Sequence, residues 1–460
     1  MNAIIISAIW GVIMMFSGIL FKSSILVRNI ATAGLLILLC GIIMDMSGNP
    51  LFEINTRNML VFDSFGMLFN AVAVACTLVY FLLSAPDMEQ VGNNLADYFA
   101  LIFFILCGVA IASTFNTLLL LFLGIEIITI PSYILTGADK RNLKSNEASL
   151  KYLLMGAFST GLMLMGITLV YGAKGSFDMS VISLGTEPMT PMIGAGMLLL
   201  IASLAFKVSA VPFHFWTPDV YDGAPTVFTS FMATVVKSAG FIAFIRLFQG
   251  SFSSMHTEWQ LVIAIIAAAT LVIGNITAIF QQSVKRMLAY SSIAQAGFML
   301  FALVALNSQA IEGIIYYAAA YSLSTIGVFA ILLKLKDYTF EGYNGLAKHH
   351  PVLAATNTIF LLSLSGIPAT AGFMAKFYML SAAVKNGQVM WLVILGVICA
   401  AISVYYYFRV IQAMYFKDGE RQDINTTMLF RWKLVALAGF LIFLGIFPEW
   451  LITKLWYFAY

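Results

Sequence analysis

Fourteen long apolar segments divide the chain, and they limit its possible folds more than any other feature. A helix needs about 20 predominantly apolar residues to cross the hydrocarbon core of a bilayer. Segments of about this length occupy residues 3–20, 28–46, 62–84, 95–114, 116–137, 147–173, 191–213, 226–248, 259–280, 286–306, 311–334, 352–385, 389–415 and 432–456. Because a backbone in lipid must satisfy its own hydrogen bonds, we expect these segments to be helices. The sequence therefore predicts an all-α integral membrane protein with about 14 transmembrane helices.

The composition excludes several classes of protein. Hydrophobic residues make up 61% of the chain and charged residues only 10%, whereas soluble domains carry about 25% charged residues. The 24 Lys and Arg residues against 21 Asp and Glu give a net charge of +3, which provides no basic face for nucleic acid. The four cysteines lie in apolar runs without a CxxC spacing, and there is no Walker A motif. We therefore expect no metal, redox cofactor or nucleotide in this chain.

The basic residues between the segments predict the orientation of the chain. Alternate loops divide them into fourteen on one side and five on the other. Cytoplasmic loops are the ones enriched in Lys and Arg, so the richer side is cytoplasmic. No small-residue cleavage site follows the first segment, so we expect it to be a retained helix. Both termini are then on the periplasmic side.

Several ionisable residues lie inside the segments. An ionised group at the bilayer centre costs roughly 3 kcal/mol, so it must pair, hydrate or lose its charge. Lysine can exchange a proton at working pH, whereas arginine cannot. We expect Glu126, Lys207, Lys237 and Lys376 to form a proton relay completed by water. The alternative is one static ion pair between Glu126 and a lysine, which leaves two lysines unexplained. Lys151 either joins the path or extends to the membrane surface.

Helix-breaking residues accompany these charges. Pro131 and Pro212 each follow a charged residue by five positions, and Gly366 and Pro368 interrupt the long segment 352–385. Proline frees a backbone carbonyl one turn earlier, which must face a partner or a cavity. A packing kink without function is the alternative reading.

A weak repeat links two of these breaks, because residues 209–212 resemble residues 365–368. Interrupted helices in corresponding places are typical of transporters built from inverted repeats. We predict two five-helix repeats at 95–250 and 251–416. Three helices at 1–94 precede them, and a C-terminal helix at 417–460 follows.

Four runs of sequence resemble a known family. They are FKVSAVPFHFWTPDVYDGAPT at 206–226, EASLKYL at 147–153, RMLAYSSI at 286–293 and GIPATAGFMAKFY at 366–378. Together they resemble subunit N of proton-translocating NADH:quinone oxidoreductase, the respiratory complex I, within the family of antiporter-like membrane subunits. The resemblance spans roughly residues 95–415, whereas the first three segments and the last match only in hydropathy.

The resemblance implies a proton-translocating subunit of the membrane arm in a bacterial inner membrane. Glu126 and Lys207 would be the charged pair of the first half-channel, Lys237 the central relay residue and Lys376 the carrier of the second half. Related antiporter subunits usually have glutamate where Lys376 stands, so this lysine favours subunit N. The partners implied are the other membrane-arm subunits, including sister antiporter-like subunits, and lipids. Flavin, iron–sulfur clusters and quinone would belong to partner subunits.

Some alternatives remain open from the sequence. His214 follows the break at Pro212, either as a residue through which protons reach the path or as a loop residue bonded to backbone. The aromatic run 405–408 is expected to pack against lipid or a neighbour rather than to bind quinone. For the whole chain, the rival functions are a subunit of a cation/proton antiporter and a structural membrane scaffold with static charges.

Overall fold

A computed structural model describes residues 1–92, 94–183, 190–385, 387, 389–419 and 424–452. Helices form the fold, and the described residues contain isolated β-bridges but no strand. Ten long helices are α1 (Asn2–Leu20), α2 (Ser24–Met46), α3 (Ser64–Met88), α4 (Leu95–Thr114), α5 (Leu118–Thr136), α6 (Leu143–Lys174), α12 (His256–Ile279), α15 (Ser308–Leu332), α19 (Met390–Phe416) and α20 (Met428–Ile446). The other helices are α7 (Met179–Ser183), α8 (Pro191–Lys207), α9 (Trp216–Gly223), α10 (Thr226–Phe231), α11 (Lys237–Ser251), α13 (Val284–Met299), α14 (Phe301–Ala305), α16 (Leu346–His349), α17 (Pro351–Ser365) and α18 (Ala371–Val384).

Twelve helices or joined helices in the described part of the chain are long and apolar enough to cross a membrane. They coincide with twelve of the fourteen predicted segments. The remaining two segments, 191–213 and 352–385, correspond to the shorter apolar helices α8, α17 and α18. The end of segment 432–456 lies outside the described residues, as do two of the basic residues counted for the orientation, Arg421 and Lys454.

Two predicted helix breaks are present. Residues 208–215 separate α8 from α9 around Pro212, and residues 366–370 separate α17 from α18 around Pro368. The first helix ends at Lys207, five residues before the proline. Ser209 and Gly366 take positive φ angles of 65° and 82° at these two helix ends. A third irregularity, a π-helical turn at Met232–Val236, joins α10 to α11 directly before Lys237.

The predicted break at Pro131 is wrong. Helix α5 continues through Pro131 to Thr136. A proline removes one N–H donor, and the rest of the helical ladder can persist around it. Ser132 and Thr136 also donate their hydroxyls to carbonyls four residues earlier, at 2.7 and 2.8 Å, within this last part of the helix.

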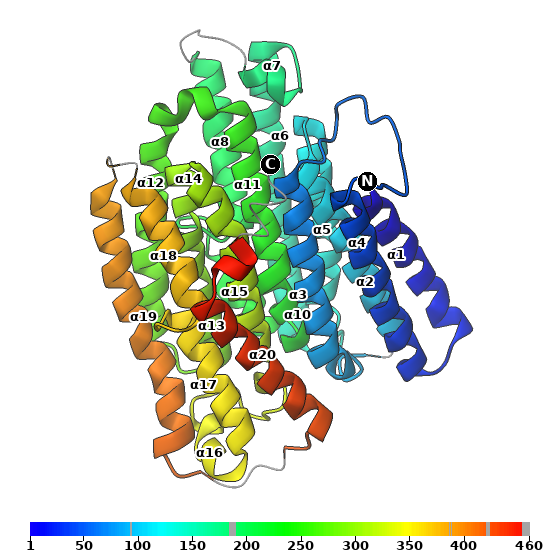
Figure 1. The fold of residues 1–460 in the computed structure, drawn as a ribbon, viewed down its shortest axis with the longest axis vertical. Coiled ribbons are helices and arrows are strands. Elements are labelled where there is room, and N and C mark those ends of the chain that lie inside the picture. Colours follow the sequence, from blue (N-terminus) through cyan, green and yellow to red (C-terminus); the bar gives the residue numbers. More distant parts are fainter. Residues whose placement is uncertain (93, 184–189, 386, 388, 420–423, 453–460) are drawn as a thin grey trace.

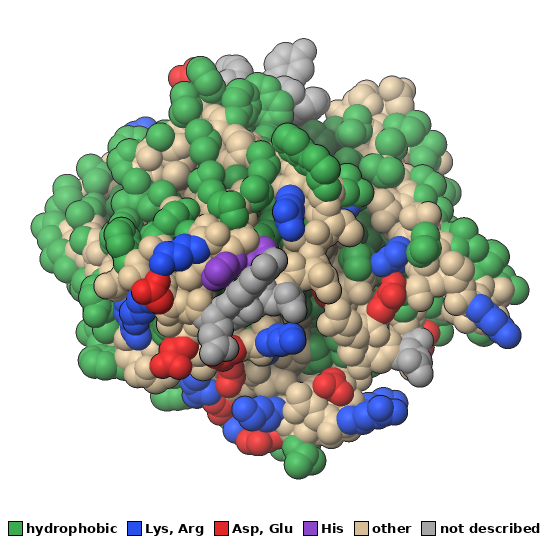
Figure 2. Space-filling model, turned by 90° about the horizontal axis from the view of Figure 1, so that it is seen from below, with side chains coloured by type: hydrophobic (Ala, Val, Ile, Leu, Met, Phe, Trp, Pro, Cys, Tyr) green, Lys and Arg blue, Asp and Glu red, His purple; other side chains and the backbone are tan. Residues whose placement is uncertain are grey.

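The helices form one elongated bundle with polar and apolar surfaces in different places. Figure 1 shows α1 and α2 at one edge of the bundle, α19 at the other, and α11, α13 and α15 between them. Helix α15 is buried along its full spanning window, whereas only 28% of the corresponding window of α1 is buried. Charged side chains gather on the end of the bundle seen in Figure 2, and apolar side chains cover its flanks. This distribution suits a protein whose flanks lie in lipid or against apolar partners.

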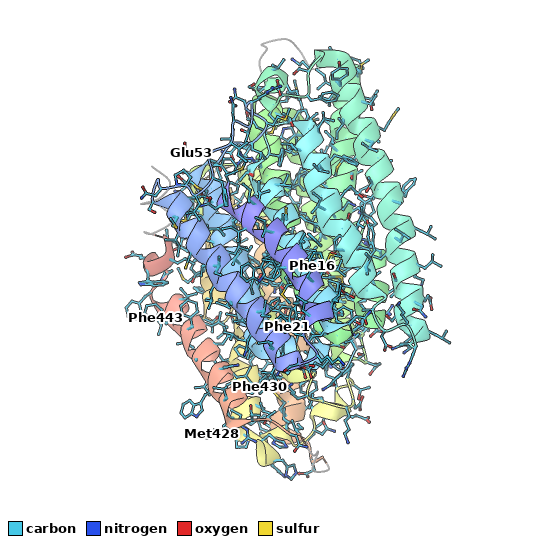
Figure 3. The ribbon with its side chains drawn as sticks, turned by 90° about the vertical axis from the view of Figure 1, so that its right-hand side faces the viewer. Phe16, Phe21, Glu53, Met428, Phe430 and Phe443 are labelled. Atoms are coloured by element: carbon cyan, nitrogen blue, oxygen red, sulfur yellow. The ribbon has the colours of Figure 1, made fainter. Side chains whose placement is uncertain are left out.

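The last long helix packs beside the first part of the chain. In Figure 3, α20, marked by Met428, Phe430 and Phe443, runs along the same side of the bundle as α1, marked by Phe16 and Phe21. The Lys433 Nζ donates to the Leu82 carbonyl at 2.8 Å, which joins α20 to α3. Helix α20 therefore contacts a helix from the first part of the chain.

Candidate functional site

Glu126 and Lys207, the pair that the resemblance implies, lie close together inside the bundle. Lys207 Nζ lies 3.9 Å from Glu126 Oε1, and their side chains are 6% and 19% exposed, respectively. The Thr160 hydroxyl lies between them, because it accepts from Lys207 at 3.2 Å and donates to Glu126 at 2.7 Å. Helices α8, α5 and α6 each contribute one member. A hydroxyl in this position can pass a proton between the two charged groups without either side chain moving far.

The first helix break contains buried polar atoms without partners. Within the described residues, Ser209 Oγ, His214 Nδ1 and Thr217 Oγ1 have no hydrogen-bond partner. Trp216 connects the two sides of the break, since its Nε1 on α9 donates to the Phe206 carbonyl of α8 at 3.0 Å. Buried polar groups are normally satisfied by protein or ordered water. Three such atoms therefore lie within or directly after this break, and His214 carries one of them.

Lys237 stands at the centre of the bundle, 2% exposed. Its Nζ donates to the Ser292 hydroxyl at 2.8 Å and to the Ser292 carbonyl at 3.1 Å. The Tyr221 ring of α9 lies 5.5 Å from the same ammonium, which brings the first break close to Lys237. The preceding π-helical turn widens the helix at this point, and such turns occur frequently at functional sites.

Lys376 lies beside the second break and not in lipid. Its residue is 5% exposed, and its Nζ donates to the Ser365 carbonyl, the last residue of α17, at 2.8 Å. The Phe298 ring lies 4.9 Å from the ammonium. The backbone at Gly366 also approaches this side chain, because a Cβ placed there would lie 2.9 Å from Lys376 Cδ. The carbonyl end of α17, which carries negative partial charge, therefore holds the lysine.

Lys151 belongs to a charged cluster nearer the surface. Its Nζ lies 2.8 Å from Glu147 and 3.0 Å from Asp219, and the Lys151 side chain is 43% exposed. Asp219 also accepts from Arg286 at 3.1 Å. Burial favours the neutral form of Asp219, but its bonds to Lys151 and Arg286 outweigh this and hold the pKa of the carboxyl below its ordinary value of 3.8. Lys151 is thus partly solvated and separate from the buried pair.

Lys285 is one of the fourteen basic residues that the sequence assigns to the cytoplasmic loops, and this assignment is wrong because Lys285 lies buried in the first turn of α13. It is 4% exposed, and its Nζ donates to the carbonyls of Asp222 and Ala224 at 2.8 and 2.7 Å. These carbonyls lie at the C-terminal end of α9, where a cation is favoured. Lys285 therefore fixes the short helix that carries Tyr221.

Two hydroxyl residues of the site were also missed, Thr160 and Ser292. Local sequence gives no signal for Thr160, because nine residues are about two and a half helical turns and place it on the opposite side of the helix from Lys151. Ser292 meets Lys237 only because α13 packs near α11, and the two residues are 55 positions apart in the sequence. Local sequence carries no information of that kind.

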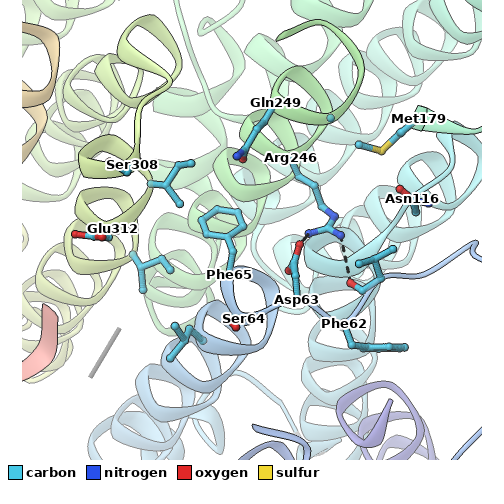
Figure 4. Close-up of a pocket in the computed structure, with 15 residues that line it drawn as sticks. Phe62, Asp63, Ser64, Phe65, Asn116, Met179, Arg246, Gln249, Ser308 and Glu312 are labelled. Carbon is cyan, nitrogen blue, oxygen red and sulfur yellow. Dashed lines mark hydrogen bonds and ion pairs between the residues drawn. The ribbon is translucent and has the colours of Figure 1, made fainter. Parts of the chain in front are cut away.

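A cavity lies at the other end of α5 from the Lys151 cluster. It has a volume of about 730 Å³ and is lined by residues including Asp63, Asn116, Arg246, Gln249 and Glu312 (Figure 4). The guanidinium of Arg246 is already bonded to Asp63 at 2.6 Å and to the Phe115 and Val61 carbonyls. We assign this cavity no ligand. Among the described residues, no group of three or more His, Cys, Asp or Glu side chains could hold a metal ion.

Known proteins match this chain along most of its length. A family model described as the transmembrane part of NADH:quinone oxidoreductase and Mrp antiporters matches residues 116–403. NADH-quinone oxidoreductase subunit N from Cytophaga hutchinsonii is 39% identical over 460 residues, a match that covers 98% of each chain.

Solved structures share the fold. A chain of the respiratory complex I from Thermus thermophilus, solved with bound aureothin, superimposes with a TM-score of 0.85 at 30% identity, and the match covers 99% of both chains. A chain of the Mrp complex from Dietzia sp. superimposes with a TM-score of 0.86 at 17% identity, covering 100% of this chain and 96% of that one. The second likeness concerns the fold alone.

Proposed function

Because the chain belongs to the NADH:quinone oxidoreductase/Mrp antiporter membrane family, we propose that it is a proton-translocating membrane-arm subunit of an NADH:quinone oxidoreductase. The observation that carries this proposal is the set of buried ionisable groups, Lys207 paired with Glu126, then Lys237 and Lys376. Burying three lysines on three helices within a membrane costs free energy. Their presence therefore favours a role in transport. Quinone reduction elsewhere in the complex would supply the driving energy.

The pathway proposed here has two halves that meet at Lys237. The first runs from Glu126 through Thr160 and Lys207 to the break around Pro212, where His214 lies. The second runs from Lys237 to Lys376 beside Gly366 and Pro368. Lys151 and its acidic neighbours lie outside this buried line and would deliver protons to it from the surface.

We also propose the finer architecture that the sequence predicts. Twelve long helices and the two segments formed by shorter ones support a count of fourteen spans. An even number of spans would put both termini on one side, and the basic loops make this the periplasmic side. The broken pair α8 and α9 and the broken pair α17 and α18 would occupy equivalent places in the inverted repeats 95–250 and 251–416. Residues 1–94 and 417–460 would flank them.

The proposal includes partners and a location. This chain would bind sister antiporter-like subunits and lipids in a bacterial inner membrane. Flavin, iron–sulfur clusters and quinone would be held by other subunits. The chain itself would contribute no redox centre to the reaction.

The central test is Lys237→Met in the assembled complex. Methionine keeps a long apolar side chain but cannot carry a proton or donate to Ser292. We expect proton pumping and coupled NADH:quinone oxidation to fall about tenfold or more, with the amount of assembled complex unchanged. Pumping is measured in inside-out membrane vesicles by the quenching of a pH-sensitive dye.

Lys348→Met is the matched control, because Lys348 is an exposed lysine paired with Asp418 at the surface. This control should pump at the normal rate. Full pumping by Lys237→Met would reject the relay and leave a scaffold with static charges. Proton transport that persists in vesicles without any redox partner subunit would favour a cation/proton antiporter instead.

A further inference from the structure

A buried polar cluster that the pathway above does not use lies beside Lys376. Gln295 of α13 is 3% exposed, and its side-chain oxygen accepts a hydrogen bond from the Tyr317 hydroxyl of α15. Its side-chain nitrogen donates to the Tyr407 hydroxyl of α19 at 3.2 Å and to the Leu364 carbonyl of α17 at 2.9 Å. Ser291, one turn earlier on α13, also bonds to the Tyr407 hydroxyl.

The aromatic run 405–408 has two different faces in the structure. Tyr405 and Phe408 are 58% and 44% exposed, as expected for residues that contact lipid or a neighbour. Tyr406 and Tyr407 are fully buried and hydrogen-bonded, Tyr406 to Asn275 at 3.1 Å and Tyr407 within the cluster. The expected packing against lipid or a neighbour therefore applies only to Tyr405 and Phe408.

The cluster acts on the same helix end that holds Lys376. Gln295 binds the Leu364 carbonyl, and Lys376 binds the next carbonyl, that of Ser365. These two residues form the last turn of α17 before the break at Gly366. Because this end lacks helical partners for its carbonyls, its position depends on the side chains that bind them. A movement of the Gln295 side chain would displace the carbonyl to which Lys376 donates.

A small cavity separates the cluster from the ammonium. Gln295, Tyr317, Tyr321, Ser324, Ser363 and Lys376 are among the residues that line it, and its volume is about 10 Å³. A space of this size admits about one water molecule, provided that polar partners surround it. Ser324 and Ser363 are bonded to each other at 2.8 Å, so hydroxyls, an amide and an ammonium surround the space.

We propose that Gln295, Tyr317 and Tyr407 are positioning residues for Lys376: together they hold the last turn of α17 so that the ammonium faces a single water in this cavity. The proposal rests on the proposed function, since it assumes that Lys376 exchanges protons during pumping. None of the three residues needs to carry a proton. Their effect on transport passes through the place and orientation of Lys376.

The structure offers a matched pair of variants, Tyr407→Phe and Tyr406→Phe. Both tyrosines are buried neighbours on α19, and each hydroxyl is bonded to a side-chain amide. Only Tyr407 bonds to Gln295, although the Tyr406 ring lies 4.5 Å from the Tyr407 ring. In the whole complex in native membrane vesicles, we expect Tyr407→Phe to lower the pumping rate about threefold and Tyr406→Phe to leave it within experimental error. Tyr317→Phe, which breaks the cluster from its other side, should behave like Tyr407→Phe.

A second measurement separates positioning from general destabilisation. The same substitution is made in a Lys376→Met background, and the amount of assembled complex is measured for each variant. A residue that acts through Lys376 has no further effect once that lysine is absent. We therefore expect Tyr407→Phe with Lys376→Met to pump at the rate of Lys376→Met alone.

Three outcomes would contradict the proposal or its premise. Equal pumping by Tyr406→Phe and Tyr407→Phe would overturn the positioning role. A further loss on adding Tyr407→Phe to Lys376→Met would show a merely structural role and overturn it as well. Normal pumping by Lys376→Met would instead reject the proposed function of the second half-channel, and that result is independent of the cluster.

Discussion

The contact between Glu126 and Lys207 depends on a third residue. At 3.9 Å the two charged atoms are beyond ordinary hydrogen-bond distance, and Thr160 bonds to both. A carboxylate that stays near the lysine stabilises its cationic form, and a carboxylate that withdraws releases it. Thr160 therefore provides both a bridge for the proton and a restraint on the separation of the pair.

This geometry predicts coupling between the two charges. The double variant Glu126→Gln with Lys207→Met should pump faster than the product of the two single losses predicts, by about fivefold or more, because either single change leaves an unpaired buried group. The measurement is a double-mutant cycle on the pumping rate. Repeating the cycle with Thr160→Val should reduce the coupling, whereas Thr168→Val, eight residues along α6 and exposed, should not. Strict additivity in the first cycle would mean that the pair does not act as a unit.

The sequence predicts which residues of the site are charged but not what surrounds them. Mid-span position alone singles out Lys237 and Lys376, because a charge in lipid is costly wherever the helices lie. It says nothing of Ser292 or Ser365, whose contacts arise from packing between helices. Lys285 shows the opposite error, a charged residue expected in solvent that the fold buries. Its place before a span suggested a solvated loop, whereas the fold buries it against the end of α9.

At the scale of helices, the two interruptions have the same consequence. Each leaves a helix end inside the bundle, α8 at Lys207 and α17 at Ser365, and a lysine lies at each end. The carbonyl end of a helix favours a cation. Proline content predicted both interruptions but also predicted one at Pro131 that does not form. The difference is that Ser209 and Gly366 adopt positive φ near the other prolines, a conformation that ends a helix, while α5 continues.

Substitution of Gly366 should therefore impair proton pumping, because a side chain at this position would collide with Lys376. Its φ of 82° disfavours any side chain, and a Cβ there would lie 2.9 Å from Lys376 Cδ and 3.3 Å from Nζ. We expect Gly366→Ala to lower pumping about tenfold by displacing the ammonium from the Ser365 carbonyl. The pumping assay is normalised to the amount of assembled complex.

Gly175→Ala is the control for backbone strain. Gly175 ends α6 with a φ of 69°, and nothing lies within 4 Å of a Cβ placed there. It should cost about 1 kcal/mol of stability without affecting the rate per complex. If both variants lose pumping equally, strain in the backbone accounts for the loss and the contact with Lys376 does not.

At the scale of the whole molecule, hydropathy predicted the helices and their order, but not how the ends of the chain join the centre. The first three predicted segments lie outside the four sequence runs that carry the resemblance, yet α3 is joined to distant parts of the sequence. The Tyr80 hydroxyl donates to the Val227 carbonyl at 3.0 Å, and Asp87 binds Lys334. Such contacts are separated by 147 and 247 residues, so no local pattern predicts them.

The Asp87–Lys334 ion pair joins three separate parts of the chain. Lys334 Nζ lies 2.6 and 2.8 Å from the two carboxylate oxygens of Asp87, which is 4% exposed. The Phe430 ring of α20 lies 4.9 Å from the same ammonium. Helix α3, the end of α15 and the start of α20 therefore converge on one lysine. Removing the carboxylate charge would leave a largely buried cation without its counter-ion.

We expect Asp87→Asn to lower the free energy of unfolding by about 3 kcal/mol, because it leaves the largely buried Lys334 ammonium without a counter-ion. Tryptophan fluorescence during SDS titration of the purified chain in detergent micelles measures this change. Asp418→Asn is the matched control, since its pair with Lys348 is exposed and should have no measurable effect. A compensating Lys334→Met should recover much of the loss in Asp87→Asn by removing the stranded charge. If the double variant is no more stable than Asp87→Asn, the carboxylate holds these helices by packing and not by its charge.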